Sequence, residues 1–402
     1  MQTIPFYEPS IGSEEINEVV DCLKSGWLTT GPRVKQFEEW FGRYVQQPYA
    51  VAVNSCTAAL HLALEAIGLK EGQCVVVPTM TFAATAEVVR YFGATPTFVD
   101  CRDEDLNLDV ADAERRIEAA LMSGGKVSAI MPVHYGGQVG DVSGVMRLAE
   151  RYNLKIVEDA AHCCPAYYKE AAGSEFSEWR PVGYSSDVVC FSFYANKCIT
   201  TGEGGMACTK QPELAERIRI MALHGISKDA WKRYTAEGSW SYEIIAPGYK
   251  YNMTDVAAAL GLRQLQRAEE LHRKRREIAA LYTSILSPVE EIILPSEPSN
   301  RISSWHLYPI RLRLDRLSID RARFIEELKR RGVGASVHWM PLHMHPYYRQ
   351  KYGYQPDEFP VAANAYAQLV SLPIFPGLGD GKVAFVADAI KDTIARYLLG
   401  RS

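Results

Sequence analysis

Short apolar runs alternate with helical patterns between about residues 50 and 210 of the chain. The runs are Val75–Val77, Thr97–Val99, Ala129–Val133, Lys155–Val157, Val188–Phe191 and Met206–Cys208. Segments between them, such as Ala111–Leu121 and Val142–Tyr152, carry apolar residues at helical spacing. Continuous apolar strands that alternate with helices are typical of an α/β fold, with a mostly parallel sheet covered on both faces. In such sheets ligands bind beyond the carboxyl ends of the strands.

The chain after residue 250 follows a different order of predicted elements. Met253–Leu286 is a long helical pattern, followed by a strand-like Trp305–Ile310, a helical Asp320–Arg331 and an apolar Ala335–Val337. The 402 residues also exceed what one hydrophobic core normally organises. We therefore expect a large domain over residues 1–255 and a smaller α+β domain over residues 256–402, with the N-terminal segment packed on the smaller one.

Composition and charge exclude several classes of partner. A net charge of −4 without a basic face argues against nucleic acid, and no apolar run approaches the ~20 residues of a membrane span. The nine cysteines are scattered and never spaced as C-x-x-C, which favours reduced thiols over disulfides. The first residues show neither the basic nor the apolar region of a secretory signal. We expect a cytoplasmic protein that acts on a small molecule.

Polar side chains follow two of the predicted strands. Lys197 lies between an apolar strand and the glycine-rich turn Thr200–Gly205, where the backbone can approach a ligand closely; elsewhere a lysine at a strand end is usually solvated. Asp159 ends another strand, and it is also a natural N-cap for a helix that starts at Ala160. In that helix His162 would lie on the same side and could stack on a flat ligand, although a lone histidine is more often a core residue.

A helix start and a hydroxyl complete this set. Thr57 and Ala58 open a helical pattern directly after a strand, so free N–H groups there suit a phosphate, and Ser192 adds a hydroxyl from the strand that leads to Lys197. Pyridoxal 5'-phosphate (PLP) needs such a set: a lysine that bonds to it and moves a proton, a carboxylate for its ring nitrogen, a flat group over its ring and a phosphate site. We therefore predict a PLP site.

No competing catalytic motif occurs, since H-E-x-x-H, P-loop and G-x-S-x-G patterns are all missing from the sequence. The histidines His338, His343 and His345 form a cluster without thiolates or carboxylates at ligand spacing. We expect no metal site, and we prefer a substrate-facing or structural role for these histidines.

The chain resembles the DegT/DnrJ/EryC1/StrS family of sugar aminotransferases over nearly its whole length. The motifs that carry the resemblance follow the family's order: Ser25–Pro32, Asn54–His61, Glu158–His162, Ser192–Gly205, Gly248–Asp255 and His343–Tyr348. The family implies the type I fold of PLP-dependent transferases, with the parallel sheet in the large domain.

The resemblance also implies a role for each matching residue. Lys197 matches the lysine that bonds to PLP, Asp159 the partner of the pyridine nitrogen, and His162 the residue that covers the ring. Thr57, Ala58 and Ser192 match phosphate ligands. A homodimer with shared sites is implied as well, in which Asn252 or Lys250 of the partner subunit reaches the phosphate. The chain has Gly-Tyr-Lys-Tyr-Asn where many members have Gly-Tyr-Asn-Tyr-Arg, so both residues stay candidates. We expect His338 and Thr30 to contact substrate.

The predicted function is transfer of an amino group from glutamate to a keto sugar, in the first place a nucleotide-linked 4-keto-6-deoxyhexose for polysaccharide biosynthesis. Relatives with histidine in place of the lysine are dehydratases, so Lys197 favours amino transfer. Two alternatives remain: an aminotransferase for another position, such as C3 or a keto-cyclitol, and a PLP-binding regulatory protein without turnover.

Overall fold

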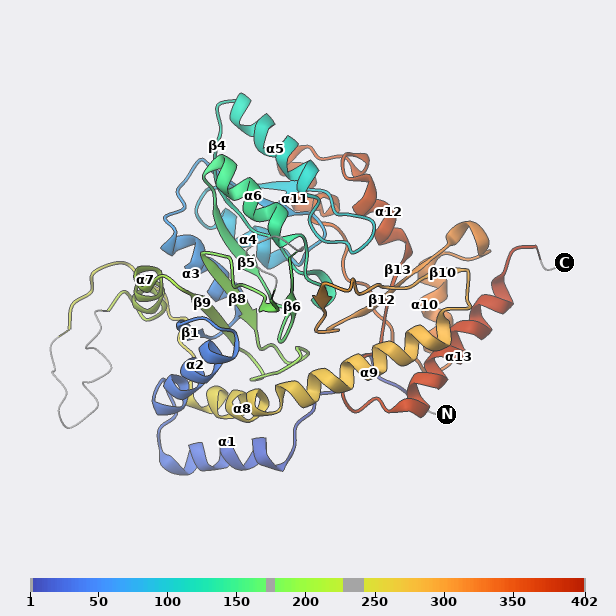
Figure 1. Cartoon of the computed structure of the whole chain (residues 1–402), viewed down its shortest axis with the longest axis horizontal. Helices are drawn as coiled ribbons and strands as arrows, with labels where there is room; N and C mark the ends of the chain where they lie inside the picture. Colours follow the sequence, from blue (N-terminus) through green and yellow to red (C-terminus); the bar gives the residue numbers. More distant parts are fainter. Residues whose placement is uncertain (1–2, 171–177, 227–241, 401–402) are drawn as a thin grey trace.

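A seven-stranded sheet forms the centre of the larger part of the molecule in the computed structural model, which describes residues 3–170, 178–226 and 242–400 (Figure 1). Its strands, in spatial order, are β1 (Tyr49–Val53), β9 (Gly205–Thr209), β8 (Val188–Ser192), β5 (Lys155–Asp159), β4 (Lys126–Ile130), β2 (Gln73–Pro78) and β3 (Thr95–Val99). Neighbours from β8 to β3 are parallel, and β9 runs antiparallel to both of its neighbours. The predicted mostly parallel sheet is confirmed.

Helices cover both faces of this sheet because its strands are apolar on both sides. On one face α3 (Cys56–Ala66), α4 (Ala83–Arg90) and α7 (Pro212–Ala222) share a core with strand residues such as Val75 and Val77. On the other face α5 (Val110–Met122) and α6 (Val142–Tyr152) pack around Val76. Beside them α2 (Pro32–Tyr44) and α8 (Asp255–Gln266) pack around Phe191, and α1 (Ser13–Ser25) lies along α8 (Figure 1).

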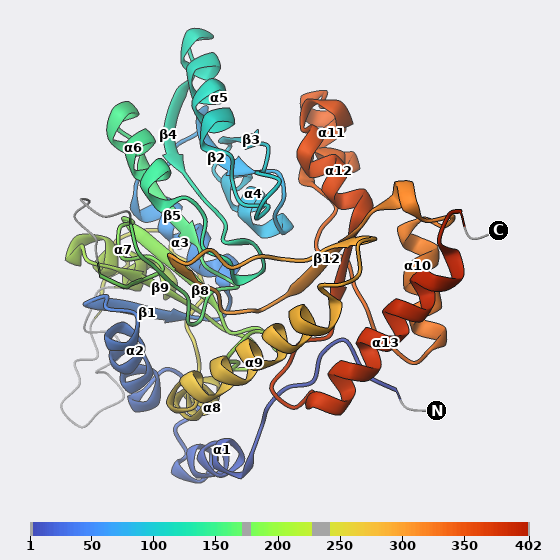
Figure 2. The ribbon, with the colours of Figure 1, turned by 45° about the vertical axis from the view of Figure 1, so that its right-hand side comes forward.

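A smaller sheet lies at the far end of the long helix α9 (Ala268–Leu286) (Figure 2). It consists of the antiparallel strands β10 (Ile292–Ile293), β12 (Tyr308–Leu312) and β13 (Leu369–Leu372), which share a core with α9, α10 (Arg321–Arg330), α13 (Asp380–Tyr397) and Ile4. Two helices that follow α10 in the chain, α11 (Pro346–Tyr352) and α12 (Pro360–Gln368), pack on the core of the larger sheet instead. We propose that residues 1–255 and 256–402 are two domains, with the N-terminal segment on the second.

The structure differs from the sequence prediction in three places. Met253–Leu286 is two helices, α8 and α9, separated at Arg267. Ala335–Val337 is not a strand, and an isolated bridge joins Ser336 to Ser371. No helix starts at Ala160, because its backbone N–H donates to Cys190 O (2.8 Å) of β8 and the chain turns there.

A third, small sheet joins β6 (Tyr167–Tyr168) to β7 (Arg180–Pro181) and to β11 (Arg301–Ile302).

Across the described ranges, none of the helices has both the length and the apolar character that crossing a membrane requires.

Candidate active site

Lys197 lies in the connection from β8 to β9, beyond the carboxyl end of β8. Backbone hydrogen bonds from Lys197 N to Tyr194 O (2.9 Å) and from Thr201 N to Phe193 O (2.9 Å) fix this turn. Burial lowers the pKa of the Lys197 ammonium, while the nearby Cys56 thiol and Asp159 carboxylate act in the opposite direction. A lysine with a lowered pKa is closer to the neutral amine that attacks an aldehyde.

Asp159 is the last residue of β5, the strand next to β8, and its side chain is buried. Its Oδ2 accepts a hydrogen bond from the Thr85 hydroxyl (2.8 Å), and its Oδ1 accepts one from the backbone N–H of Ala161 (3.1 Å). Burial raises the pKa of the Asp159 carboxyl, and these two hydrogen bonds and the Lys197 charge oppose the rise. Because a carboxylate has about four acceptor sites, Asp159 can accept a further donor such as a protonated ring nitrogen.

The N-terminus of α3 and the end of β8 lie close together at this end of the sheet. Ser192 pairs with Gly205 in the ladder between β8 and β9. A Cβ atom on Gly205 would lie 2.4 Å from the backbone oxygen of Ser55, so glycine is needed for α3 to begin this close to the strands. The α3 N-terminus, whose free N–H groups suit an anion, therefore begins beside the strand pair that carries Ser192. The Ala58 N–H already donates a hydrogen bond to the Ser55 hydroxyl, which caps the helix (3.1 Å). Of the two predicted phosphate ligands, Ala58 is therefore the one whose backbone N–H has a partner within the chain.

His162 is close enough to Lys197 to feel its charge, but it lies in a turn rather than in the predicted helix. Its Nδ1 accepts a hydrogen bond from the backbone N–H of Gly136 (3.2 Å), so the neutral ring carries its proton on Nε2. The His162 ring stacks on Trp339 (4.9 Å between centroids, 26° between planes) and lies 4.2 Å from the ring of His306. Burial and the Lys197 charge hold the pKa of His162 well below its ordinary value. A neutral flat ring is thus available to cover a cofactor.

The structure brings His338 to the same site. Burial, followed by the positive charge of Lys197, lowers the pKa of His338 to about 4. Its Nδ1 lies 2.9 Å from Ser371 Oγ, and its ring stacks on Phe6 at 5.4 Å. His343 and His345 have other partners, and in the described part of the chain no three His, Cys, Asp or Glu side chains gather as metal ligands would.

Thr30 and Asn252 are joined to each other rather than to Lys197. The Asn252 side-chain amide donates to Thr30 Oγ1 (2.7 Å), and the Thr30 hydroxyl donates to Met253 O (2.6 Å). A bridge between Val53 and Asn252 puts this pair at the end of β1, next to the start of α3. Lys250, two residues earlier, is exposed.

Sequence reasoning missed four residues of this site. Thr85 contacts Asp159, Trp339 and His306 contact His162, and the Tyr7 hydroxyl donates to Ala195 O in the turn before Lys197. One signal was available for Thr85, because it ends a stretch with three threonines that directly follows β2. His306 lies in the strand-like Trp305–Ile310 and Trp339 beside His338, but no spacing there indicates a contact with His162.

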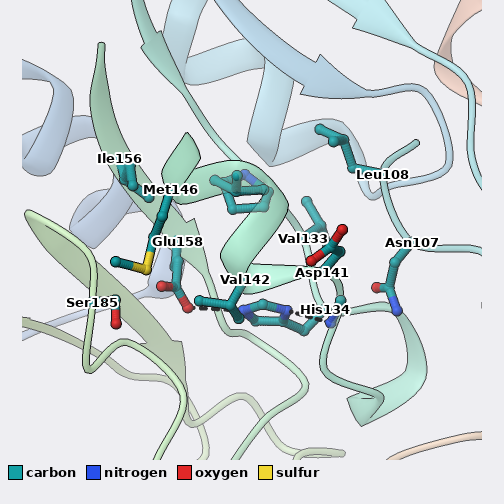
Figure 3. A pocket seen from close by; sticks show the side chains of 13 residues that line it. Asn107, Leu108, Val133, His134, Asp141, Val142, Met146, Ile156, Glu158 and Ser185 are labelled. Carbon is teal, nitrogen blue, oxygen red and sulfur yellow. Dashed lines mark hydrogen bonds and ion pairs between the residues drawn. The ribbon is translucent and has the colours of Figure 1, made fainter. Parts of the chain in front are cut away.

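Glu158 of β5 and His134 of the loop after β4 form a buried pair (Figure 3). Glu158 Oε2 accepts hydrogen bonds from His134 Nε2 (2.8 Å) and from Gly183 N (3.0 Å), while Gly140 N donates to His134 Nδ1 (3.2 Å). The cavity beside them is about 10 Å³, which is room for about one water molecule and not for a substrate. The pair therefore joins β5 to the loop before α6 and to the loop before β8.

Glu158→Ala is expected to lower the free energy of unfolding by about 2–4 kcal/mol, because it leaves the His134 and Gly183 donors buried without an acceptor. Urea denaturation followed by circular dichroism measures this change. Glu150→Ala, at an exposed position of α6, is the matched control and should change stability by less than ~0.5 kcal/mol. Equal stability of the two variants would contradict a structural role for the pair.

The chain is similar to known proteins from end to end. The model of the DegT/DnrJ/EryC1/StrS aminotransferase family matches residues 9–391. The uncharacterized protein MJ1066 of Methanocaldococcus jannaschii is 45% identical and covers 98% of this chain and 98% of its own. The spore coat polysaccharide biosynthesis protein SpsC of Bacillus subtilis is 42% identical, over 97% of both chains.

A solved structure with the same fold is the putative sugar aminotransferase Spr1654 from Streptococcus pneumoniae. Its PMP-form is 32% identical to this chain, with a TM-score of 0.87, and covers 98% of both chains. Its PLP-form is 33% identical, with a TM-score of 0.87, and covers 98% of this chain and 99% of its own.

Proposed function

Because this chain belongs to the DegT/DnrJ/EryC1/StrS aminotransferase family and is a PLP-dependent sugar aminotransferase, we propose that it moves the amino group of glutamate to a nucleotide-linked 4-keto-6-deoxyhexose. The observation that carries this proposal is the meeting of Lys197, Asp159 and His162 at the carboxyl end of the sheet. The name of SpsC, a polysaccharide biosynthesis protein, supports a sugar that is built into a polysaccharide.

The residues present at this end of the sheet fit PLP. Asp159 offers a buried carboxylate with spare acceptor capacity, and the α3 N-terminus lies beside the Ser192 hydroxyl across Gly205. When bound, PLP supplies an aldehyde that takes up the amino group of a donor and later releases it to an acceptor carbonyl. We propose that Asp159 faces the ring nitrogen and that Thr57, Ala58 and Ser192 bind the phosphate.

Lys197 has two tasks in this proposal. Its Nζ bonds to the cofactor, and it moves the proton away from the donor carbon that carries the amino group and returns a proton to the sugar carbon that receives it. Burial favours both tasks, because it lowers the pKa of the Lys197 ammonium and so increases the fraction of neutral amine. His162 and Trp339 present stacked flat rings beside Lys197, which would exclude water from one side of the cofactor. We propose His338 and Thr30 as substrate contacts.

We further propose that the enzyme works as a homodimer with shared active sites. Three large apolar side chains of α1 are exposed at helical spacing, namely Ile16 (56%), Val20 (37%) and Leu23 (52%). Such a stripe on one helix face is typical of a surface that another chain covers.

Co-expression of two inactive variants tests the shared site. If Asn252 serves the site of the other subunit, subunits with Lys197→Ala and subunits with Asn252→Ala combine into heterodimers that hold one intact site. Random assembly then restores about a quarter of the activity of the natural dimer. The same experiment with Lys250→Ala decides between the two candidates. For the residue that reaches the phosphate, the alanine variant has low activity alone and regains activity when it is co-expressed with Lys197→Ala.

The control for this experiment pairs Lys197→Ala with the double variant Lys197→Ala/Asn252→Ala, which leaves no intact site in any assembly. Activity in that control measures the background. A mixture no more active than its control, although Asn252→Ala alone is impaired, would contradict sharing between subunits. Full activity of both Asn252→Ala and Lys250→Ala would contradict the assignment of either residue.

The substrate is tested with a set of nucleotide-linked keto sugars and glutamate. Mass and proton spectra of the product identify the carbon that receives the amine. The proposal expects amination at C4 of a 6-deoxyhexose. Amination at C3 only, or of a keto-cyclitol only, would overturn the substrate assignment and leave the aminotransferase in place.

We propose the cytoplasm as the site of the reaction. All nine cysteines are free, which supports a reducing compartment.

A further inference from the structure

Two threonines form a buried hydroxyl chain that ends on Asp159. Thr81 Oγ1 lies 2.7 Å from Thr85 Oγ1, and the Thr85 hydroxyl donates to Asp159 Oδ2 (2.8 Å). Thr81 lies in the loop after β2 and Thr85 in the first turn of α4; their exposed fractions are 1% and 0%. Water therefore cannot replace either hydroxyl without a change in packing.

The geometry fixes the direction of this chain. A carboxylate only accepts hydrogen bonds, so the Thr85 proton points at Asp159. The single proton of Thr85 is then used, and the bond to Thr81 must be one in which Thr81 donates to Thr85 Oγ1. Hydrogen bonds aligned in one direction polarise each other, which strengthens the bond at the carboxylate end.

Few other groups stabilise the Asp159 charge. The groups that face it are Lys197 after β8, His134 after β4, the Ala161 backbone N–H, and the thiols Cys56, Cys163 and Cys190. Burial raises the pKa of the Asp159 carboxyl, and the Thr85 hydrogen bond is the largest influence that lowers it, ahead of Ala161, Lys197 and His134.

We propose that Thr85, supported by Thr81, is a positioning residue that keeps Asp159 an anion aimed at the cofactor ring nitrogen. This inference rests on the proposed function, because it takes Asp159 to be the partner of that nitrogen. Thr85 does not touch the cofactor itself; it acts through the carboxylate.

The test compares PLP with an analogue in which carbon replaces the ring nitrogen. Both aldehydes bond to Lys197 and both carry the phosphate, so the ratio of their dissociation constants reports on the contact between Asp159 and the ring atom. The ratio is measured by absorbance titration of the cofactor-free protein. Four forms are compared: the natural protein, Thr85→Val, Thr85→Ser and Thr393→Val. Thr393 is the matched control, since it is also a fully buried helical threonine, and its hydroxyl donates to Ala389 O (2.7 Å) in α13.

The natural protein is expected to prefer PLP. In Thr85→Val this preference falls by about tenfold, because the variant removes one hydrogen bond to a buried charged group. The preference also disappears at a higher pH in Thr85→Val than in the natural protein, because a carboxyl with a higher pKa is protonated sooner as the pH falls. Thr85→Ser keeps the hydroxyl and should restore the natural ratio, and Thr393→Val should leave it unchanged.

The outcomes separate the two hypotheses. A natural protein that prefers PLP, with the same ratio in Thr85→Val, overturns the role of Thr85 and leaves Asp159 as the nitrogen partner. A natural protein without any preference overturns the Asp159 assignment, and the role of Thr85 with it. A ratio that falls as much in Thr393→Val as in Thr85→Val would trace the effect to general destabilisation and also contradict the proposal.

Discussion

Lys197→Ala is expected to lower the rate of amino transfer by about 10³-fold, because the variant loses both the amine that bonds to the cofactor and the group that moves the proton. The amine of Lys197 has no substitute in His162, His338 or Cys56, because burial lowers the pKa of both histidines and raises that of the thiol. The measurement is a single-turnover reaction with glutamate and keto-sugar acceptor, followed by quantification of the aminated sugar.

Lys126→Ala serves as the control, because Lys126 is an exposed lysine at the start of β4, at the opposite end of its strand from the site. It should react at the natural rate. Circular dichroism of Lys197→Ala should match the natural protein, since the backbone bonds of the turn do not involve the side chain. Amino transfer by Lys197→Ala at the natural rate would contradict the mechanism.

Asp159→Asn is expected to lower the rate by about 10²-fold, the usual effect of removing one oriented charge from an active site. The amide keeps the size of the carboxylate and can still accept a hydrogen bond from Thr85, but it carries no charge to balance a protonated ring nitrogen. Cofactor affinity should fall in parallel, because a hydrogen bond to a charged group is exchanged for one to a neutral group. Steady-state rates and absorbance titration with PLP measure the two effects.

Asp109→Asn is the isosteric control for this variant. Asp109 caps α5 by accepting from the N–H groups of Ala111 and Asp112, and asparagine caps a helix almost as well. The control should therefore keep the natural rate and cofactor affinity. If Asp159→Asn behaved in the same way, the carboxylate would not be the partner of the cofactor ring.

The fold was predictable from the chain because its signal is local and repeated. Runs such as Val75–Val77 are apolar on both faces, and both Val75 and Val76 are fully buried in the sheet, against different helices. The predicted helix boundaries were wrong where contacts between distant parts of the chain determine the backbone conformation. Arg267 interrupts a helical pattern without a proline or glycine, and Ala160 is held in a turn by a strand residue that is 30 positions further along the chain.

The candidate site was predictable where a residue lies at a strand end or a helix start. Lys197, Asp159, Ser192 and Thr57 all have such positions, which the order of the parallel strands gathers at one edge of the sheet. Thr85 and Asp159 are 74 positions apart, and His306 comes from the segment that leads to the smaller sheet. Their contacts depend on how whole elements pack, and no spacing in the sequence encodes that.

Mixing the PLP-loaded protein with glutamate, without an acceptor, tests the central claim most directly. We expect the absorbance of the aldehyde form to be replaced by that of the amine form, with one 2-oxoglutarate released per active site. The Lys197→Ala protein should show neither change at a comparable rate. An absorbance that neither glutamate nor any other common amino acid alters would contradict the account and favour a PLP-binding regulatory protein without turnover.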